Sequence, residues 1–269
     1  MIELFDENRK DMQRKSSKGN QLKWESEGKW YKADFMGYEG LAEYMVSSLL
    51  EKSNLKKDYF AKYNLEHIRY KHTEYEGVKS KNFLRDDWQI ITLERLYKNR
   101  YNKSFTESLW KIPDVKERLR FLVDEMQQIT GIPDFGIYMS RLLTIDAFFL
   151  NEDRHMHNVA VLMNGKGQFI CCPYFDHGAA LLSDIKMDYP VGVDVIQLMD
   201  DVKAKTISQS FDEALDAAEE LYGYHLRFTF GKKDVDELLA GVDRYPDEIK
   251  NRVRTILFLQ IRKYEYLFR

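Results

Sequence analysis

Short strand-like runs of apolar and aromatic residues dominate the first part of the chain. The sequence Glu-Ser-Glu-Gly at 25–28 is typical of a turn, and the residues on either side of it predict a β-hairpin. Residues 63–72 and 78–84 predict two further strands, joined by a turn near Glu76-Gly77. Between the hairpin and these strands, apolar residues recur at helical spacing over residues 40–52, which predicts one helix.

Helical spacing of apolar residues dominates after residue 88. The apolar stripes that predict helices start at Val115, Ile137, Phe211 and Val253. One β-hairpin is expected among them, with strands at 159–163 and 169–175 and a turn rich in Asn and Gly between them.

These patterns predict an α+β chain with two lobes. We expect a small β-rich N-terminal lobe over residues 1–84 and a larger helical C-terminal lobe, with one hairpin, over residues 85–269. A cleft between two such lobes is a natural place for a ligand.

Composition narrows the function classes. Of the 269 residues, 44% are apolar and 32% are charged, and the formal net charge is only -3, so we expect a sizeable core and no direct nucleic-acid partner. No apolar run approaches the roughly 18 residues that span a bilayer, so no membrane association is expected. The adjacent Cys171 and Cys172 point to opposite faces if they lie in a strand, which favours core residues in a reducing, cytoplasmic compartment.

The candidate chemistry lies between Asn151 and Gly178, in Asn-Glu-Asp-Arg-His-Met-His-Asn (151–158) and Phe-Asp-His-Gly (175–178). The predicted hairpin would bring Asp153, Asn158 and Asp176 to the same end. Magnesium prefers hard oxygen ligands and keeps several waters, so Asn158 and Asp176 suit a Mg²⁺ site. Asp153 would then orient a substrate hydroxyl and accept its proton, as phosphoryl transfer requires.

The order Asp-Arg-His-x-x-Asn, strand pair, Asp-x-Gly resembles the catalytic and metal-binding loops of phosphatidylinositol 3-kinase-type kinases. It resembles the bacterial HipA-like Ser/Thr protein kinases more closely, in particular the short stand-alone CtkA type. Upstream, Gly19-Asn20-Gln21-Leu22-Lys23 resembles the HipA phosphate-loop pattern Gly-x-Gln-x-Lys. The resemblance covers roughly residues 16–180, and the remainder matches only as a helical lobe.

The resemblance implies a two-lobed protein-kinase-like fold, ATP and Mg²⁺ as cofactors, and a protein Ser/Thr hydroxyl as acceptor. Lys32 would grip the α- and β-phosphates, and Glu39, at the start of the following helix, would orient Lys32. Glu43, one helical turn later, competes with Glu39 for this role. His155 would organise the loop around Asp153 by hydrogen bonding, and Asp146 on the preceding helix would brace it.

Two further segments are expected to contact the nucleotide. The phosphates would be covered by Ser16, Ser17, Lys18, Gly19, Asn20, Gln21 and Lys23. The connection between the lobes would read the adenine edge through Phe83, Leu84, Arg85 and Asp86. The family analogy also implies autophosphorylation at Ser16 or Ser17, and an antitoxin as a partner.

Two alternatives remain open. His155, His157, Asp176 and His177 could be the ligands of a metal-dependent hydrolase, because imidazole clusters suit transition metals. The chain could also be a pseudokinase or toxin–antitoxin-type module that binds nucleotide without transferring phosphate. The presence of Lys32, Asp153, Asn158 and Asp176 together argues against this second alternative.

Overall fold

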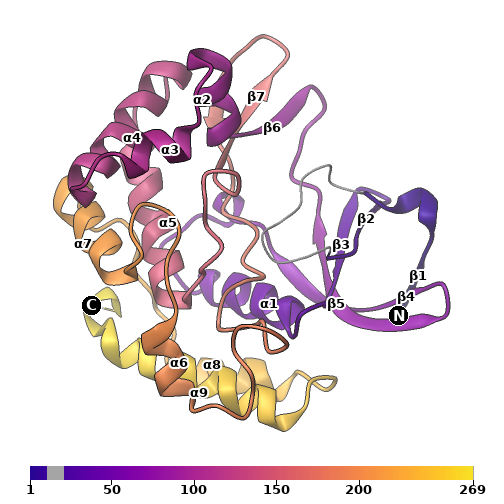
Figure 1. Cartoon of the computed structure of the whole chain (residues 1–269). Helices are drawn as coiled ribbons and strands as arrows, with labels where there is room; N and C mark the ends of the chain where they lie inside the picture. The colour runs from indigo at the N-terminus through magenta and orange to yellow at the C-terminus, as the bar shows by residue number, and fades with distance from the viewer. Residues whose placement is uncertain (11–20, 269) are drawn as a thin grey trace. The chain divides into compact units, whose positions relative to one another are not determined.

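The computed structural model describes residues 1–10 and 21–268 of the chain. Strands dominate up to residue 92 and helices dominate the remainder, so the α+β class expected from the sequence is confirmed (Figure 1). In the described part of the chain, no helix combines the length and the apolar character needed to cross a membrane.

The chain forms two compact units that each combine separate segments. Unit 1 consists of Met1–Phe83, Phe175–Val202 and Arg227–Arg269, and unit 2 consists of Leu84–Tyr174 and Lys203–Leu226. Two segments after residue 174 thus group with the N-terminal sheet. The first segment of unit 1 ends at Phe83, and the division into lobes at residue 84 stays a prediction.

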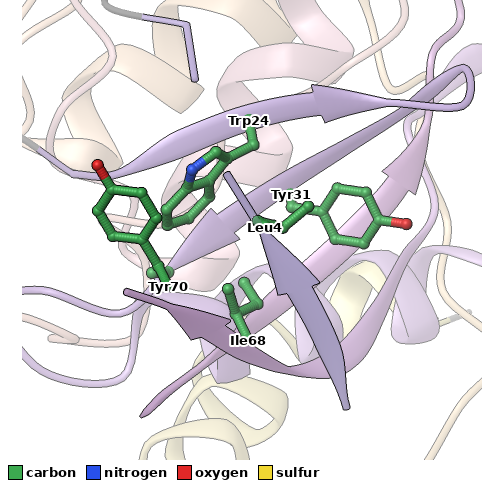
Figure 2. Close-up of a cluster of buried hydrophobic side chains, with 6 residues drawn as sticks. Leu4, Trp24, Tyr31, Ile68 and Tyr70 are labelled. Carbon is green, nitrogen blue, oxygen red and sulfur yellow. The ribbon is translucent and has the colours of Figure 1, made fainter. Parts of the chain in front are cut away.

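A five-stranded sheet forms the centre of unit 1, in the order β1-β4-β5-β3-β2 (Figure 1). Its strands are β1 (Ile2–Leu4), β2 (Lys23–Ser26), β3 (Lys29–Ala33), β4 (Tyr63–Tyr70) and β5 (Thr73–Lys81). β1 pairs with β4 in parallel, and the other pairs are antiparallel. One apolar cluster joins four of these strands through buried side chains; Figure 2 labels Leu4, Trp24, Tyr31, Ile68 and Tyr70.

The predicted β2–β3 hairpin is confirmed, with a two-residue turn at Glu27 and Gly28. Both turn residues have positive φ, 51° and 70°, as the twist of a two-residue hairpin favours. The hairpin sets Lys23 opposite Lys32.

The turn predicted near Glu76-Gly77 is wrong, because β4 and β5 turn at Lys71 instead, where φ is 56°. Gly77 lies inside β5, and a Cβ on it would stand 2.1 Å from the backbone carbonyl oxygen of Lys32. A Cβ on Gly40 of the next helix would stand 2.8 Å from Gly77 Cα. The glycine therefore serves close packing of helix on sheet.

Among the described residues of unit 1, the α-helices are α1 (Glu39–Leu50), α6 (Val195–Asp201), α8 (Lys232–Ala240) and α9 (Asp247–Lys263). α1 packs on β3, β4 and β5, while α8 contacts both α1 and α9. α1 is buried over most of its length, so its predicted apolar spacing is confirmed.

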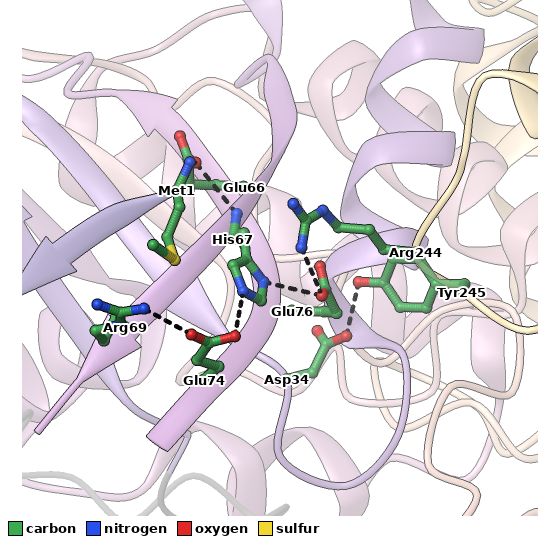
Figure 3. A network of polar contacts seen from close by, with 9 residues as sticks. All are labelled: Met1, Asp34, Glu66, His67, Arg69, Glu74, Glu76, Arg244 and Tyr245. Atoms are coloured by element: carbon green, nitrogen blue, oxygen red, sulfur yellow. Dashed lines mark hydrogen bonds and ion pairs between the residues drawn. The ribbon is translucent and has the colours of Figure 1, made fainter. Parts of the chain in front are cut away.

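A polar network fastens the loop before α9 to the sheet of unit 1 (Figure 3). The Tyr245 hydroxyl donates to Asp34 Oδ2 at 2.7 Å, and Arg244 Nη1 lies 3.5 Å from Glu76 Oε1. The same Glu76 oxygen lies 2.9 Å from His67 Nδ1. These contacts explain how a C-terminal segment belongs to the same unit as the N-terminal strands.

Unit 2 contains five helices and a three-stranded antiparallel sheet in the order β6-β7-β8. The helices are α2 (Leu93–Tyr101), α3 (Phe105–Trp110), α4 (Val115–Thr130), α5 (Phe135–Phe149) and α7 (Phe211–Tyr222). The strands are β6 (Trp88–Thr92), β7 (Ala160–Asn164) and β8 (Phe169–Cys171).

The β7–β8 hairpin is shorter than predicted, and β6 was not predicted. The returning strand ends at Cys171, not at Phe175. Pro173 has no N–H to donate and cannot continue the ladder. Asp176 therefore lies in an irregular segment five residues beyond the strand.

Candidate active site

Lys32 of unit 1 is the centre of a buried cluster of charges. The strand β3 aims it at α1, where its Nζ lies 2.5 Å from Glu43 Oε1 and 2.6 Å from Asp176 Oδ1. Only 8% of Lys32 and 1% of Glu43 are exposed. We call Lys32, Glu43 and Asp176 the Lys32 cluster.

Burial and charge act in opposite directions on the Lys32 cluster. Burial acts to lower the pKa of Lys32, but the carboxylates of Asp176 and Glu43 outweigh it and hold that pKa well above its usual value. Lys32 is therefore an ammonium at neutral pH. Burial raises the pKa of Glu43, and the neighbouring Lys32 only partly offsets this.

The predicted pairing of Lys32 with Glu39 is wrong, and Glu43 is the partner. The Glu39 carboxylate instead accepts hydrogen bonds from the backbone N–H groups of Phe35, Met36 and Gly37 at 3.2, 2.6 and 3.1 Å. Glu39 is the first residue of α1, and its carboxylate holds the turn that leads into the helix. One turn later, Glu43 faces the sheet.

The backbone around Asp176 is held by the same cluster. The N–H of His177 donates to Glu43 Oε2 at 2.9 Å, so one carboxylate binds both Lys32 and the chain beside Asp176. The N–H of Asp176 lies 3.5 Å from the Tyr63 hydroxyl oxygen. Asp176 has φ of 62°, a left-handed conformation that few non-glycine residues adopt and that clusters at functional sites.

In unit 2, a buried ion pair braces the loop that carries Asp153, which we call the Asp153 loop (residues 150–158). Arg154 Nε lies 3.0 Å from Asp146 Oδ2, and Arg154 Nη2 donates to Asp146 Oδ1 at 3.2 Å. Asn151 Nδ2 donates to the same Oδ1 at 2.8 Å. The bracing role predicted for Asp146 is therefore confirmed. Burial raises the pKa of Asp146 despite the pairing with Arg154.

Asn158 orients Asp153 inside this loop. Its Nδ2 donates to the Asp153 backbone carbonyl at 2.8 Å and to Asp153 Oδ2 at 3.2 Å. His155 Nε2 lies 3.7 Å from Asp153 Oδ1, and His155 Nδ1 accepts from the N–H of His157 at 3.3 Å. These contacts match the loop-organising role predicted for His155.

Lys205 is a contact of Asp153 that sequence reasoning missed. Its Nζ lies 3.8 Å from Asp153 Oδ1 and 3.8 Å from Glu152 Oε2. Lys205 follows Asp153 by more than 50 residues in a segment without a recognised motif, so no local signal pointed to it.

Several predicted nucleotide contacts stay predictions. Ser16, Ser17, Lys18, Gly19 and Asn20 lie outside the described residues. Gln21 and Lys23 are described, and Lys23 begins β2 opposite Lys32.

The predicted adenine-reading segment spans the boundary of the two units. Phe83 ends the first segment of unit 1 and packs on Phe175 with ring centroids 5.6 Å apart. Leu84, Arg85 and Asp86 begin unit 2 and lead into β6. Their contact with adenine stays a prediction.

The predicted magnesium ligands have suitable donor atoms. Both hydrogen bonds of the Asn158 side chain within the described residues use Nδ2, which leaves the amide oxygen to face a cation. Asp176 offers a carboxylate that is 25% exposed. Over residues 1–10 and 21–268, no three His, Cys, Asp or Glu side chains gather as a metal-binding group, so the His/Asp hydrolase site has no assembled ligand set there.

Comparisons with known proteins agree with the fold. No protein-family model matches the sequence, and no curated protein matches it. The structure is similar to the Helicobacter pylori proinflammatory kinase CtkA, with a TM-score of 0.60 and 15% identity over 91% of this chain and 90% of that one. HipA from the toxin–antitoxin complex of Shewanella oneidensis MR-1 gives a TM-score of 0.44 and 13% identity, over 90% of this chain and 59% of HipA. The chain therefore has the kinase-like α+β fold of the CtkA type.

Proposed function

We propose that the chain is an ATP- and Mg²⁺-dependent kinase that transfers the γ-phosphoryl group to a Ser or Thr hydroxyl of a protein. The observation that carries this proposal is the Lys32 cluster, in which one buried ammonium is shared by two carboxylates at 2.5 and 2.6 Å. One ammonium beside two carboxylates leaves one negative charge in excess, and a metal cation would balance that charge. The kinase-like fold supports nucleotide binding in general.

Lys32 would bind the nucleotide phosphates, and Glu43 would orient Lys32. Lys32 would donate hydrogen bonds to α- and β-phosphate oxygens, and Glu43 would keep its ammonium aimed at them. As Lys32 turns to the phosphates, Asp176 would be released to face a metal ion. The Glu43–His177 hydrogen bond would keep Asp176 in position during this change.

Asp176 and Asn158 would hold Mg²⁺, through one carboxylate and one amide oxygen. Such a sparse set suits magnesium, which retains most of its waters. When bound, the ion would neutralise negative charge on the β- and γ-phosphates.

Asp153 would orient the acceptor hydroxyl and take its proton. Asn158 fixes both the backbone and the carboxylate of Asp153, and the Asp146–Arg154 pair fixes the loop around it. A base held this way is preorganised for its proton acceptor role.

The protein acceptor, autophosphorylation at Ser16 or Ser17 and an antitoxin partner come from the resemblance to HipA-like kinases. A fold does not determine a substrate. Mass spectrometry after incubation with ATP and Mg²⁺ tests the serines directly: phosphate on either one supports autophosphorylation, and its absence from both contradicts it.

The experiment that tests the proposal measures ATP binding and turnover of the wild type and Asp176→Asn, each with and without Mg²⁺. We expect the wild type to bind ATP more tightly with Mg²⁺ and to form ADP and a phosphoprotein with a generic protein acceptor. Asp176→Asn should lose most of the Mg²⁺ dependence. Wild-type binding without transfer would favour the pseudokinase alternative, and no ATP binding at all would contradict both readings.

A further inference from the structure

Lys205 is an exposed lysine whose immediate neighbours in the chain are buried. Its side chain is 41% exposed, whereas the neighbouring positions have at most 4% exposure. These neighbours are Ala204, Thr206, Ile207 and Ser208. The buried residues on both sides of Lys205 hold its backbone in a defined position.

Hydrogen bonds fasten this loop to the rest of unit 2. The Thr206 hydroxyl donates to the Arg154 carbonyl at 2.7 Å, directly beside Asp153. The Arg118 guanidinium of α4 donates to the Ile207 carbonyl. The N–H of Ala204 donates to the Gln209 carbonyl at 3.0 Å and closes the loop. These hydrogen bonds hold the backbone around Lys205 beside the Asp153 loop.

The ammonium of Lys205 lies near two carboxylates but donates a hydrogen bond to neither of them. Its distance of 3.8 Å to both Glu152 and Asp153 exceeds the length of a hydrogen bond. The side chains of Glu152 and Asp153 are only 7% and 11% exposed. Nζ can thus attract these carboxylates electrostatically while its N–H donors remain available for an anion.

We propose that Lys205 is a catalytic residue that donates a hydrogen bond to a non-bridging γ-phosphoryl oxygen at Asp153. This inference rests on the proposed function. In the step, the hydroxyl oxygen of the acceptor forms a bond to the γ-phosphorus, and the bond from that phosphorus to the β,γ-bridging oxygen breaks. ADP leaves with the electron pair, and the hydroxyl proton passes to Asp153.

The charges around Asp153 explain why this step needs a cation. Asp153 and Glu152 together bring two negative charges to the place where a phosphoryl group with further negative charge must arrive. Lys205 offsets this repulsion without forming a covalent bond. Because Lys has three donors on a mobile stem, it can follow the phosphoryl oxygens during transfer.

The test compares Lys205→Met, Lys205→Arg and the matched control Lys203→Met, which removes another exposed lysine two residues earlier. Single-turnover transfer of γ-phosphate at increasing ATP gives a maximal rate and a half-saturating ATP concentration. Removal of one such donor is expected to lower the maximal rate about 100- to 1,000-fold while ATP binding is retained. Lys205→Arg should recover part of the rate, and Lys203→Met should stay within about twofold of the wild type.

A second readout separates catalysis from structure. Lys205→Met should bind MgADP like the wild type but lose the tighter binding of MgADP with aluminium fluoride, which mimics the transferring phosphoryl group. A lowered Tm with parallel losses of ADP binding and rate would indicate a structural role and overturn the inference. Normal transfer by Lys205→Met would overturn it and leave the kinase proposal intact, whereas an inactive wild type would overturn both.

Discussion

The Lys32 cluster of unit 1 and the Asp146–Arg154 pair of unit 2 are both buried, and they differ in how their charges balance. Asp146 and Arg154 lie eight residues apart, and their opposite charges cancel within one local segment. Lys32 instead joins Glu43 and Asp176 from distant parts of the chain and leaves one negative charge in excess. The balanced pair suits a scaffold, and the unbalanced cluster suits a site that receives a cation and phosphates.

Breaking the balanced pair should give the largest loss of stability. In Arg154→Met the buried Asp146 loses its cation, which should lower the free energy of unfolding by about 3–5 kcal/mol. Urea unfolding measures this. The matched control is Arg120→Met, which breaks the exposed pair with Glu117 and should cost at most about 1 kcal/mol. Equal losses in the two variants would contradict the scaffold role.

Substitutions in the Lys32 cluster should instead change the rate of phosphoryl transfer at low ATP. Glu43→Gln keeps the shape and an acceptor for the His177 N–H, but removes the charge that aims Lys32. Loss of one charge-assisted hydrogen bond should reduce the transfer rate at low ATP about 10- to 100-fold.

Glu39→Gln is the matched control on the same helix. It weakens the hydrogen bonds that the Glu39 carboxylate accepts from the turn before α1, which should cost about 1 kcal/mol of stability and leave transfer within about twofold. A larger loss of transfer in Glu39→Gln than in Glu43→Gln would restore the pairing expected from the sequence.

This reassignment shows where sequence reasoning succeeds. Periodicity located α1 and the strand of Lys32, because both depend on local spacing of apolar residues. The choice between Glu39 and Glu43 depends on which turn of the helix faces Lys32, and the local spacing of apolar residues does not determine that. A carboxylate at the first position of a helix is favoured by the helix dipole, which was a visible signal for a local structural role of Glu39.

The contacts within the Asp153 loop were predicted more completely than its contacts with residues distant in sequence. Asp146, Asp153, His155 and Asn158 fall within 13 residues, so their mutual contacts follow from one helix end and one loop. The position of Lys205 depends on how the two segments of unit 2, residues 84–174 and 203–226, pack together. No local sequence pattern encodes this packing. The early end of β8 could have been predicted, because Pro173 is visible in the sequence and cannot donate a hydrogen bond to the β7–β8 ladder.

Glu94, another buried carboxylate of unit 2, should give the smallest effect, and its pH dependence should have the opposite sign from that of Glu43 and Asp146. Burial acts to raise its pKa, but hydrogen bonds from Thr106, Ser104 and Phe105 outweigh it and lower the pKa below the usual 4.5. Because the folded pKa is lowered, Glu94 contributes stability above pH 4.5 and loses it as pH falls through the folded pKa.

Urea unfolding of wild type and Glu94→Gln across this range tests the sign. We expect a difference of about 1 kcal/mol near neutral pH that shrinks upon acidification below the ordinary pKa. A difference that grows as pH falls would show that burial, not hydrogen bonding, dominates at Glu94.

The central claim is that Asp153 acts in the transfer step while the Lys32 cluster handles the nucleotide. Single-turnover transfer of labelled γ-phosphate by Asp153→Asn, measured over a range of Mg-ATP concentrations, tests it most directly. We predict a maximal rate lowered by about 100-fold or more, because a general base is lost, with a half-saturating ATP concentration within about threefold of the wild type. An unchanged maximal rate, or a loss explained by weaker ATP binding alone, would contradict the account.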